Sequence, residues 1–360
     1  MNILLVRLSS FGDILFTTPV IDAIHRAHPG AQVDVVTYQR FAGALEHHPG
    51  VRRLLRLPKK SLGQAFKSCR VGAFTRGFSR FASELRAERY DLAVDLHNVT
   101  DSSLVARLAR AAHRVGNRRQ TLSTGFRTRC GFDDRNETAH EHAAVSNLRY
   151  LVDAGVLDEQ SLTEPPRLSF YTPQDARQNV DRYLAENDLA GRQLVGLNPG
   201  GSYEYKRWPP ERFAEVGAYL QQQLGSPVLL FGGPAEREVV SRVAAGIPGP
   251  VVDTSALPMF DAFELISRLR LFVTNDSAPL HIAAAARVPA VGLYGPANFE
   301  KFYPLSDLIE PVLVDVPCRP CTPKQGRACR HRDCFGRMTV QRVCGICDVV
   351  LEKSFKKLAS

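Results

Sequence analysis

Residues that could do acid–base chemistry interrupt the first apolar run of the chain, in the stretch RLSSFGD. The run predicts a buried strand over residues 3–7, and two serines, a glycine and Asp13 follow it before a helical pattern begins. Asp13 could cap that helix, because carboxylates are stabilised at helix N-termini. It could instead act as a general base held at the carboxyl end of a strand. The residues alone leave both interpretations open.

A second group of polar residues follows an apolar run in the stretch LNPGGSYEYKRWPPERFAEV. Gly200 and Gly201 let the backbone approach a ligand closely, Ser202 offers a hydroxyl, and Lys206 offers a positive charge. Together these groups suit a pyrophosphate. For Lys206 alone, a solvated surface residue is the simpler interpretation.

The stretch LFVTNDSAPLHIAAAARVPAVGLYGP carries the more specific pattern. Its NDS triplet lies between a buried strand and an alanine-rich helix, so the amides near Ser277 and Ala278 are expected to bind phosphate oxygens. Asp276 could cap that helix or accept hydrogen bonds from sugar hydroxyls. His281 neighbours the predicted anion site, although a lone histidine is more often a core or surface residue.

Six of the eight cysteines lie in a tail after residue 317. A C-x-x-C pair and two further thiols have the spacing of a metal site, and iron or zinc would suit four thiolates in a structural role. Four reduced thiols in a loop are the alternative. The predicted ligands are Cys318, Cys321, Cys329 and Cys334. Cys344 and Cys347 fall on the apolar stripe of a helix and are expected to pack.

Short apolar strands alternate with helix-period segments along the whole chain, which predicts an α/β protein with parallel sheets. At 360 residues, two doubly wound domains are expected, with the proline-rich stretch SLTEPPRLSFYTP as the linker. No G-x-G-x-x-G and no P-loop motif occurs, which weakens the ordinary dehydrogenase and P-loop interpretations. The predicted strands of the first half are 3–7, 32–38 and 90–97, the helices are about 13–28 and 101–112, and a helix near 174–187 opens the second half. The predicted divisions are 1–172, 173–338 with the cysteine-rich loop 318–334, and a C-terminal helix over 339–360 that packs back on the first domain.

The net charge of +9 is unevenly distributed, since residues 52–89 hold eleven Lys and Arg against two Glu. This surface suits an anionic, partly apolar partner such as a glycolipid headgroup, with nucleic acid as a competing partner and a solvated basic face as the simplest alternative. Four phenylalanines accompany these charges: Phe66, Phe74, Phe78 and Phe81. No apolar run reaches the length of a membrane span or a signal peptide, so a cytoplasmic protein is expected.

Four stretches of the chain resemble glycosyltransferase family 9, the heptosyltransferases that use ADP-heptose to build lipopolysaccharide core. They are RLSSFGDILFTTPVIDAI, NPGGSYEYKRWPPERFAEV, FGGPAERE and TNDSAPLHIAAAARVPAVGLYGP, in the family's order. The resemblance implies a GT-B fold of two facing Rossmann-like domains with a cleft between them. It also implies inverting transfer that needs no metal, although some members carry cysteine-bound iron near the corresponding tail.

The resemblance also implies a role for individual residues. Asp13 becomes the general base, Lys206 meets the charge of the departing diphosphate, Glu236 accepts hydrogen bonds from ribose hydroxyls, and Asp276 contacts the donor sugar. The remaining donor-binding positions are Gly201, Ser202, Ser277, Ala278 and His281, and the acceptor-binding positions are Ser10 and Gly12.

The partners implied are ADP-heptose and an anionic glycolipid acceptor at the inner face of the cytoplasmic membrane, with peripheral membrane contact and no nucleic acid. Two alternatives remain: transfer to a serine of an autotransporter protein, and a non-catalytic basic module that binds membrane or nucleic acid. Retention of Asp13, Lys206 and Asp276 together argues against the non-catalytic alternative.

Overall fold

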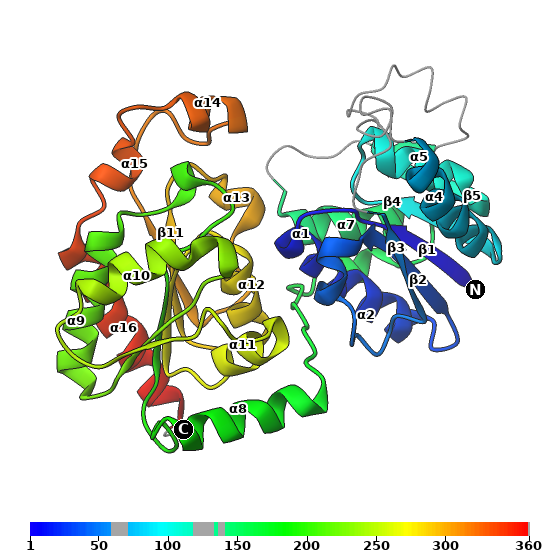
Figure 1. Ribbon diagram of the computed structural model, residues 1–360. Coiled ribbons are helices and arrows are strands. Elements are labelled where there is room, and N and C mark those ends of the chain that lie inside the picture. The colour runs from blue at the N-terminus through cyan, green and yellow to red at the C-terminus, as the bar shows by residue number, and fades with distance from the viewer. Residues whose placement is uncertain (59–70, 118–132, 136–140, 359–360) are drawn as a thin grey trace. The chain divides into compact units, whose positions relative to one another are not determined.

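The computed structural model describes residues 1–58, 71–117, 133–135 and 141–358. The chain forms two compact units, Met1–Tyr171 and Thr172–Ser360. Each unit contains a six-stranded sheet within the described residues, and the pairings between strands are parallel (Figure 1). The division between the units lies one residue before the predicted one.

The first sheet has the strand order β3-β2-β1-β4-β5-β6. Its central strand β1 is a continuous apolar run because helices cover both faces of the sheet. Ile3 of β1 lies opposite Val33 on one neighbour and Leu92 on the other. The strands are β1 (Asn2–Val6), β2 (Gln32–Tyr38), β3 (Arg53–Leu57), β4 (Arg89–Asp95), β5 (Arg110–Asn117) and β6 (Asp133–Arg135).

Helices lie on both faces of this sheet (Figure 1). α4 and α5 bury Phe81, Leu85 and Val105 against Leu4 and Val6 of β1 on one face, while α2 packs against α7 on the other. The helices are α1 (Phe11–Leu15), α2 (Thr18–Ala27), η1 (Gln39–Ala44), α4 (Val71–Arg86), α5 (Thr100–Leu108), α7 (Ala143–Asp153) and η2 (Glu159–Leu162).

Two predicted helices of this unit have different bounds in the structure. The helix expected over 13–28 is two helices, because a turn at residues 16–17 separates α1 from α2 and Pro19 occupies the first turn of α2. Proline is tolerated there but not inside a continuous helix. The helix expected to reach residue 112 ends at Leu108, and the chain re-enters the sheet as β5.

The second sheet has the order β12-β11-β10-β7-β8-β9. Counted along the chain within each unit, this is the same 3-2-1-4-5-6 order as in the first sheet, the doubly wound arrangement of nucleotide-binding folds. The strands are β7 (Val195–Asn198), β8 (Val228–Leu230), β9 (Val251–Asp253), β10 (Leu271–Asn275), β11 (Ala290–Tyr294) and β12 (Ile309–Leu313).

The helices of the second unit also form two layers. Figure 1 shows α9, α10 and α16 on one side of the sheet and α11 and α12 on the other, and α8 packs against α11. The longer helices are α8 (Gln174–Glu186), α9 (Pro210–Leu224), α10 (Arg237–Ala245), α11 (Met259–Ile266), α12 (Ala278–Ala285) and α16 (Val340–Leu358). The shorter ones are η3 (Glu204–Lys206), η4 (Pro234–Glu236), α13 (Phe299–Phe302), α14 (Pro323–Ala328) and α15 (Asp333–Gly336).

The C-terminal helix belongs to the second unit. We expected residues 339–360 to pack back on the first domain, but the apolar stripe of α16 lies in the core of the second unit. Val343, Cys347 and Val350 are 0%, 0% and 3% exposed there, and α16 contacts α9, β11 and β12. The stripe therefore finds its apolar partners within its own unit, and Cys344 and Cys347 pack as expected.

The described part of the basic segment 52–89 presents fewer unpaired charges and fewer exposed phenylalanines than its composition indicates. Arg52 and Arg53 pair with Asp34 and Glu88, Arg56 pairs with Glu46 and Arg80 pairs with Glu84. Phe81 is buried and Phe78 packs on the same core. Arg86 and Arg89 are exposed. The remaining residues of the predicted surface fall outside the described residues: Lys59, Lys60, Phe66, Lys67, Arg70 and the side chains of Phe74 and Arg76. In the described part, Phe78 and Phe81 therefore pack on the core rather than lie among the surface charges.

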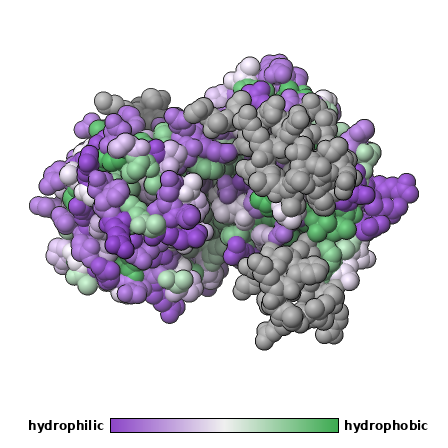
Figure 2. Space-filling model, turned by 90° about the horizontal axis from the view of Figure 1, so that it is seen from above, coloured by the Kyte–Doolittle hydropathy of each residue, from purple (hydrophilic) through white to green (hydrophobic). Residues whose placement is uncertain are grey.

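In the part of the chain that the structure describes, no helix is both long enough and apolar enough to cross a bilayer. Figure 2 shows that the visible face of the second unit, on the left, is largely hydrophilic, with apolar residues in small groups.

Candidate functional site

Asp13, Lys206 and Asp276 lie where the strand order of each sheet reverses. In the first unit this point lies between β1 and β4, and in the second it lies between β7 and β10. Ligands of doubly wound sheets bind beyond the carboxyl ends of the strands at such points. Asp13 follows β1, the Gly200–Lys206 segment follows β7, and Asp276 follows β10.

Asp13 lies in the first turn of α1 and both of its carboxylate oxygens have partners. The Ser10 backbone N–H and the Ser10 hydroxyl donate to Oδ2 over 2.8 and 3.0 Å. The Arg7 Nη2 lies 3.0 Å from Oδ1. The capping interpretation is therefore confirmed, since the carboxylate accepts from the backbone of the residue that precedes the helix.

The charge state of Asp13 follows from these partners. Burial opposes ionisation, but the Arg7 guanidinium and the two hydrogen bonds from Ser10 outweigh it, so the pKa of Asp13 is lowered. Asp13 is therefore ionised at neutral pH. A base held in this way is available at any ordinary pH, although its intrinsic basicity is reduced.

Two residues that the sequence analysis did not select complete this end of the first sheet. Arg7 directly follows β1, and its Nη1 also donates to the Leu96 carbonyl. His97 follows β4 and places its Nε2 3.4 Å from the Ser9 hydroxyl. Burial and the nearby Arg7 charge lower the pKa of His97 to about 4, against a smaller opposing effect of Asp13. His97 is therefore neutral at pH 7.

In the second unit, a carboxylate joins two glycine-containing loops. Glu236 Oε1 accepts the Gly201 N–H over 2.5 Å, and Oε2 accepts the Gly233 N–H over 2.8 Å. A Cβ at Gly200 would lie 2.4 Å from the Glu236 carboxyl group, so this position has no room for a side chain. Glu236 thus holds the loop after β7 against the loop after β8, in addition to any contact with a ligand.

Side chains from neighbouring elements fix the same loop. Arg207 donates from Nε and Nη2 to the Gly201 carbonyl over 3.0 and 2.7 Å. Asn275 Nδ2 donates to the carbonyls of Pro199 and Gly200 over 2.9 and 3.0 Å. Neither Arg207 nor Asn275 was selected from the sequence, because their partners are distant or are backbone groups. The loop is rigidly built, as a phosphate-binding backbone requires.

Lys206, Asp276 and Ser277 come together beside this loop. Lys206 Nζ donates to Asp276 Oδ2 over 3.1 Å, and the Asp276 side chain is only 10% exposed. Ser277 precedes α12, and Asn198 at the end of β7 donates to its hydroxyl over 3.2 Å. The first amides of a helix have no intrahelical acceptor and favour anions. The Lys206 ammonium group and the first amides of α12 thus lie near Asp276, whose carboxylate can accept hydrogen bonds from hydroxyl groups.

The other predicted positions are distributed as follows. Ser202 is exposed, Ala278 is half-buried in the first turn of α12, and His281 is buried one turn further along that helix. In the first unit, Gly12 is buried within α1 and Ser10 is exposed.

The predicted metal ligands do not form a ligand set. Cys318 is exposed, Cys321 and Cys329 are partly exposed, and Cys334 is buried, all as free thiols. No three His, Cys, Asp or Glu side chains among the described residues are grouped so that they could hold a metal ion. Burial, together with the charges of neighbouring cysteines, raises the pKa of Cys321 and of Cys334, and Cys334 lies in the core of its unit. The structure therefore does not form the predicted four-thiolate site.

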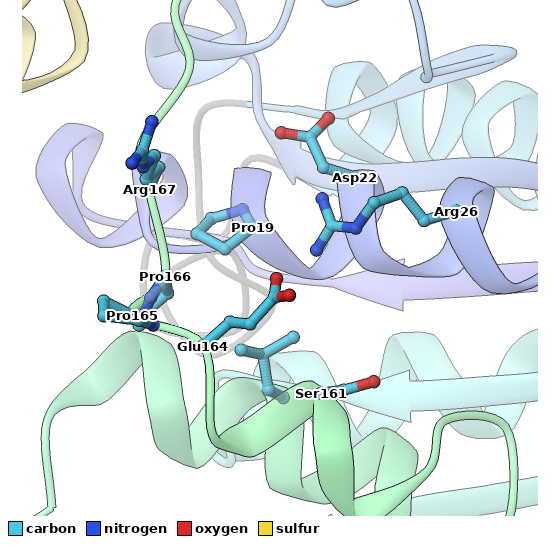
Figure 3. A pocket seen from close by; sticks show the side chains of 9 residues that line it. Pro19, Asp22, Arg26, Ser161, Glu164, Pro165, Pro166 and Arg167 are labelled. Atoms are coloured by element: carbon cyan, nitrogen blue, oxygen red, sulfur yellow. The ribbon is translucent and has the colours of Figure 1, made fainter.

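One cavity of the first unit lies away from these residues. It has a volume of about 400 Å³, and Figure 3 shows the Arg26 side chain extending from α2 toward Glu164, whereas the Asp22 carboxylate points away from Glu164. None of the predicted site residues lines it. In the second unit, a cavity of about 600 Å³ is lined by Arg207 but by none of the predicted ligands. The predicted site residues thus line neither of these two cavities.

The two doubly wound sheets are those of the GT-B fold, with charged side chains and helix amides at each strand-order reversal. The model of glycosyltransferase family 9 (heptosyltransferase) matches residues 78–331, and the chain belongs to this family. It is therefore an enzyme that transfers a sugar.

The relatives agree with this assignment over nearly the full chain. Lipopolysaccharide heptosyltransferase 1 of Pseudomonas aeruginosa is 29% identical, covering 95% of this chain and 96% of its own. Lipopolysaccharide heptosyltransferase 3 of Escherichia coli is 30% identical, covering 82% of this chain and 84% of its own. A family 9 glycosyl transferase from Veillonella parvula has a TM-score of 0.84 at 23% identity, covering 98% of this chain and 97% of its own. The ADP-heptose lps heptosyltransferase II of E. coli has a TM-score of 0.76 at 22% identity, covering 98% of this chain and 99% of its own.

Proposed function

We propose that this glycosyltransferase transfers heptose from ADP-heptose to a lipopolysaccharide inner-core acceptor, with inversion at the anomeric carbon. The names of its curated relatives support the sugar and the acceptor class. The observation that carries the proposal is the Lys206–Asp276 pair beside the Gly200–Gly201 loop, because it combines groups for a diphosphate with a carboxylate for sugar hydroxyls.

The second unit binds the donor in this proposal. Lys206 and the amides near Ser277 and Ala278 meet the diphosphate, and Asp276 accepts hydrogen bonds from the sugar. Glu236 has two carboxylate oxygens with several lone pairs, so it can accept from ribose hydroxyls while it holds Gly201 and Gly233. The leaving ADP gains negative charge as the bond from C1 to the phosphate oxygen breaks, and these cations and amides stabilise that charge without a metal ion.

The first unit activates the acceptor in this proposal. Asp13 accepts the proton of the acceptor hydroxyl as the acceptor oxygen forms its bond to C1 and ADP departs. Arg7 and Ser10 keep the carboxylate ionised and oriented for this step. The neutral His97 adds no positive charge beside Asp13, since burial and Arg7 lower its pKa to about 4.

The experiment that tests this function supplies purified protein with ADP-heptose and a heptose-free core glycolipid. We expect acceptor-dependent release of ADP and a product whose anomeric configuration is opposite to that of the donor, which NMR can assign. A parallel reaction offers a serine-containing autotransporter fragment as acceptor. Transfer to the peptide but not to the glycolipid would replace the proposed acceptor, and no donor-dependent ADP release with either would refute the enzyme function proposed here.

We further propose that the protein works in the cytoplasm, in peripheral contact with the inner membrane where a glycolipid acceptor resides. The support is the acceptor class and the charge of +9. Binding to anionic vesicles should fall steeply with salt, because exposed charges are screened beyond about 8 Å at physiological ionic strength. Binding that is equal for neutral and anionic vesicles would contradict this electrostatic contact.

A further inference from the structure

Tyr294 holds a buried polar group that the proposed mechanism does not use. The residue ends β11, its side chain is 0% exposed, and its ring packs edge-on against Phe299 at a centroid distance of 5.0 Å. Its hydroxyl is buried and has no hydrogen-bond partner among the described residues. A buried hydroxyl without a partner destabilises the folded protein, and native structures contain few of them. Such a group suggests a partner in another state of the site.

The sheet register shows which group is near. Asn275 of β10 lies opposite Leu293 of β11, and the Asp276 N–H donates to the Leu293 carbonyl over 3.1 Å. The parallel register thus continues for one more residue, which places Asp276 beside Tyr294. Side chains at paired positions project from the same face of a sheet. The charge of Asp276 also adds to the effect of burial in raising the pKa of Tyr294.

Asp276 has a partner that an anionic ligand would compete for. Its Oδ2 accepts from Lys206 Nζ, whose side chain is 31% exposed, whereas Asp276 itself is 10% exposed. If Lys206 turns to a diphosphate, Asp276 is left as a nearly buried carboxylate that has lost its cation. Such a charge requires another donor.

We propose that Tyr294 is a positioning residue whose hydroxyl donates to Asp276 when Lys206 engages the diphosphate of the bound nucleotide sugar. This inference rests on the proposed function, because it needs an anionic donor at Lys206. The hydroxyl then holds Asp276 ionised and in the orientation that accepts hydrogen bonds from the sugar. Asp276 thus changes its hydrogen-bond donor from Lys206 to Tyr294. This change couples binding of the diphosphate to the orientation of the carboxylate that contacts the sugar.

Tyr294→Phe tests the inference because it removes one oxygen and keeps the ring against Phe299. We expect kcat/KM for ADP-heptose to fall about 10-fold or more, the effect of losing a hydrogen bond to a charged group. The melting temperature of the ligand-free protein should stay the same or rise, since the hydroxyl has no partner there. Affinity for ADP alone, which lacks the sugar, should change little.

Tyr90→Phe is the matched control. Tyr90 is 2% exposed and its hydroxyl donates to Asp34 over 2.8 Å in the first unit. This variant should lower the melting temperature and leave kcat/KM unchanged. The two tyrosines thus give opposite patterns if Tyr294 acts only in the liganded site.

A double-mutant cycle that combines Tyr294→Phe with Asp276→Ala tests whether Tyr294 acts through Asp276. Non-additive losses, in which Tyr294→Phe adds nothing once Asp276 is absent, support the inference. Wild-type kinetics of Tyr294→Phe, additive losses, or a lower melting temperature of the ligand-free variant would each overturn it. If Asp276→Ala is impaired while Tyr294→Phe is not, only this inference fails. Wild-type protein that neither binds nor consumes ADP-heptose would overturn the proposed function as well.

Discussion

The reversal points of the two sheets share one strand order but are built from different groups. Beyond β1 and β4, charged side chains contact one another, with Asp13 held by Arg7 and Ser10. Beyond β7 and β10, the Lys206–Asp276 ion pair lies beside the Gly200–Gly201 loop, whose backbone groups are held by the side chains of Asn275 and Glu236.

This difference shows how one topology can serve two tasks. A reactive carboxylate needs a fixed charge state, which an adjacent cation and N–H donors provide. A polyanion needs many donors at fixed positions, which an ordered backbone and a helix start provide. The shared fold therefore gives the location of each site, whereas the residues after the strands give its chemistry.

The largest expected effect is at the first reversal point. Asp13→Asn should reduce turnover by about 10²- to 10⁴-fold, the usual contribution of a general base. ADP affinity should remain near that of the wild type, because ADP is assigned to the second unit. Steady-state kinetics and calorimetric titration with ADP measure the two quantities separately.

Ser10→Ala is the companion variant for this position. It removes one hydrogen bond to Asp13 but keeps the backbone donor and Arg7, so a much smaller loss is expected. If Asp13→Asn and Ser10→Ala lose equal amounts of turnover, the loss comes from a disturbed loop structure and not from removal of the carboxylate.

The complementary change is at the second reversal point. Lys206→Met should weaken ADP binding about 10- to 100-fold, as expected for losing a charge-assisted hydrogen bond to the diphosphate. Arg242→Met serves as the control, since its ion pair with Glu211 is exposed in the same unit. Unchanged ADP affinity in Lys206→Met would remove the distinction between a binding unit and an acid–base unit.

Protonation of His97, in the first unit, should make the free energy of unfolding depend on pH. Its folded pKa of about 4 lies below the ordinary 6.5, so the unfolded chain takes up the proton first as the pH falls. The contribution of His97 to stability is constant above pH 6.5 and should decline between about pH 6.5 and 4, by up to about 3 kcal/mol. Urea unfolding of wild type and His97→Gln at a series of pH values measures this, and a difference between them that is constant from pH 7 to 5 would refute it.

The smallest expected effects separate packing from metal binding in the cysteines of the second unit. Cys347→Ser should lose about 1–3 kcal/mol, because it buries a hydroxyl in an apolar core. Cys318→Ser should change stability by less than about 0.5 kcal/mol, since the residue is exposed. A structural metal would reverse this order, and metal analysis of the purified wild-type protein would confirm such a reversal.

The central strands could be predicted from the sequence, because β1, β10 and β11 are apolar runs with buried neighbours on both sides. Strand β5 could not. Its Arg114 donates to the carbonyls of Ala106 and Ala109 at the end of α5 over 3.1 and 2.9 Å. In the fold, Arg114 has hydrogen-bond acceptors at the end of a helix. In the sequence, a charged residue at this position interrupts the apolar pattern that predicts a strand.

The site shows the same division. Residue types predicted Asp13, Lys206 and Asp276, because a carboxylate or a lysine in a strand-end loop suggests its own chemistry. Arg7 and Arg207 were missed, since their roles depend on which carboxylate or carbonyl the fold brings to them. Spacing along the chain does not contain those distances.

The bridge that Glu236 makes has a consequence for conformational entropy. Because one carboxylate ties the Gly201 and Gly233 amides together, both loops have lost most of their freedom before any ligand arrives. A ligand that contacts them orders little further backbone, so its binding enthalpy is offset by a smaller entropic loss than a pair of independent loops would impose. Folding, and not donor binding, is therefore the step at which this part of the enzyme becomes ordered.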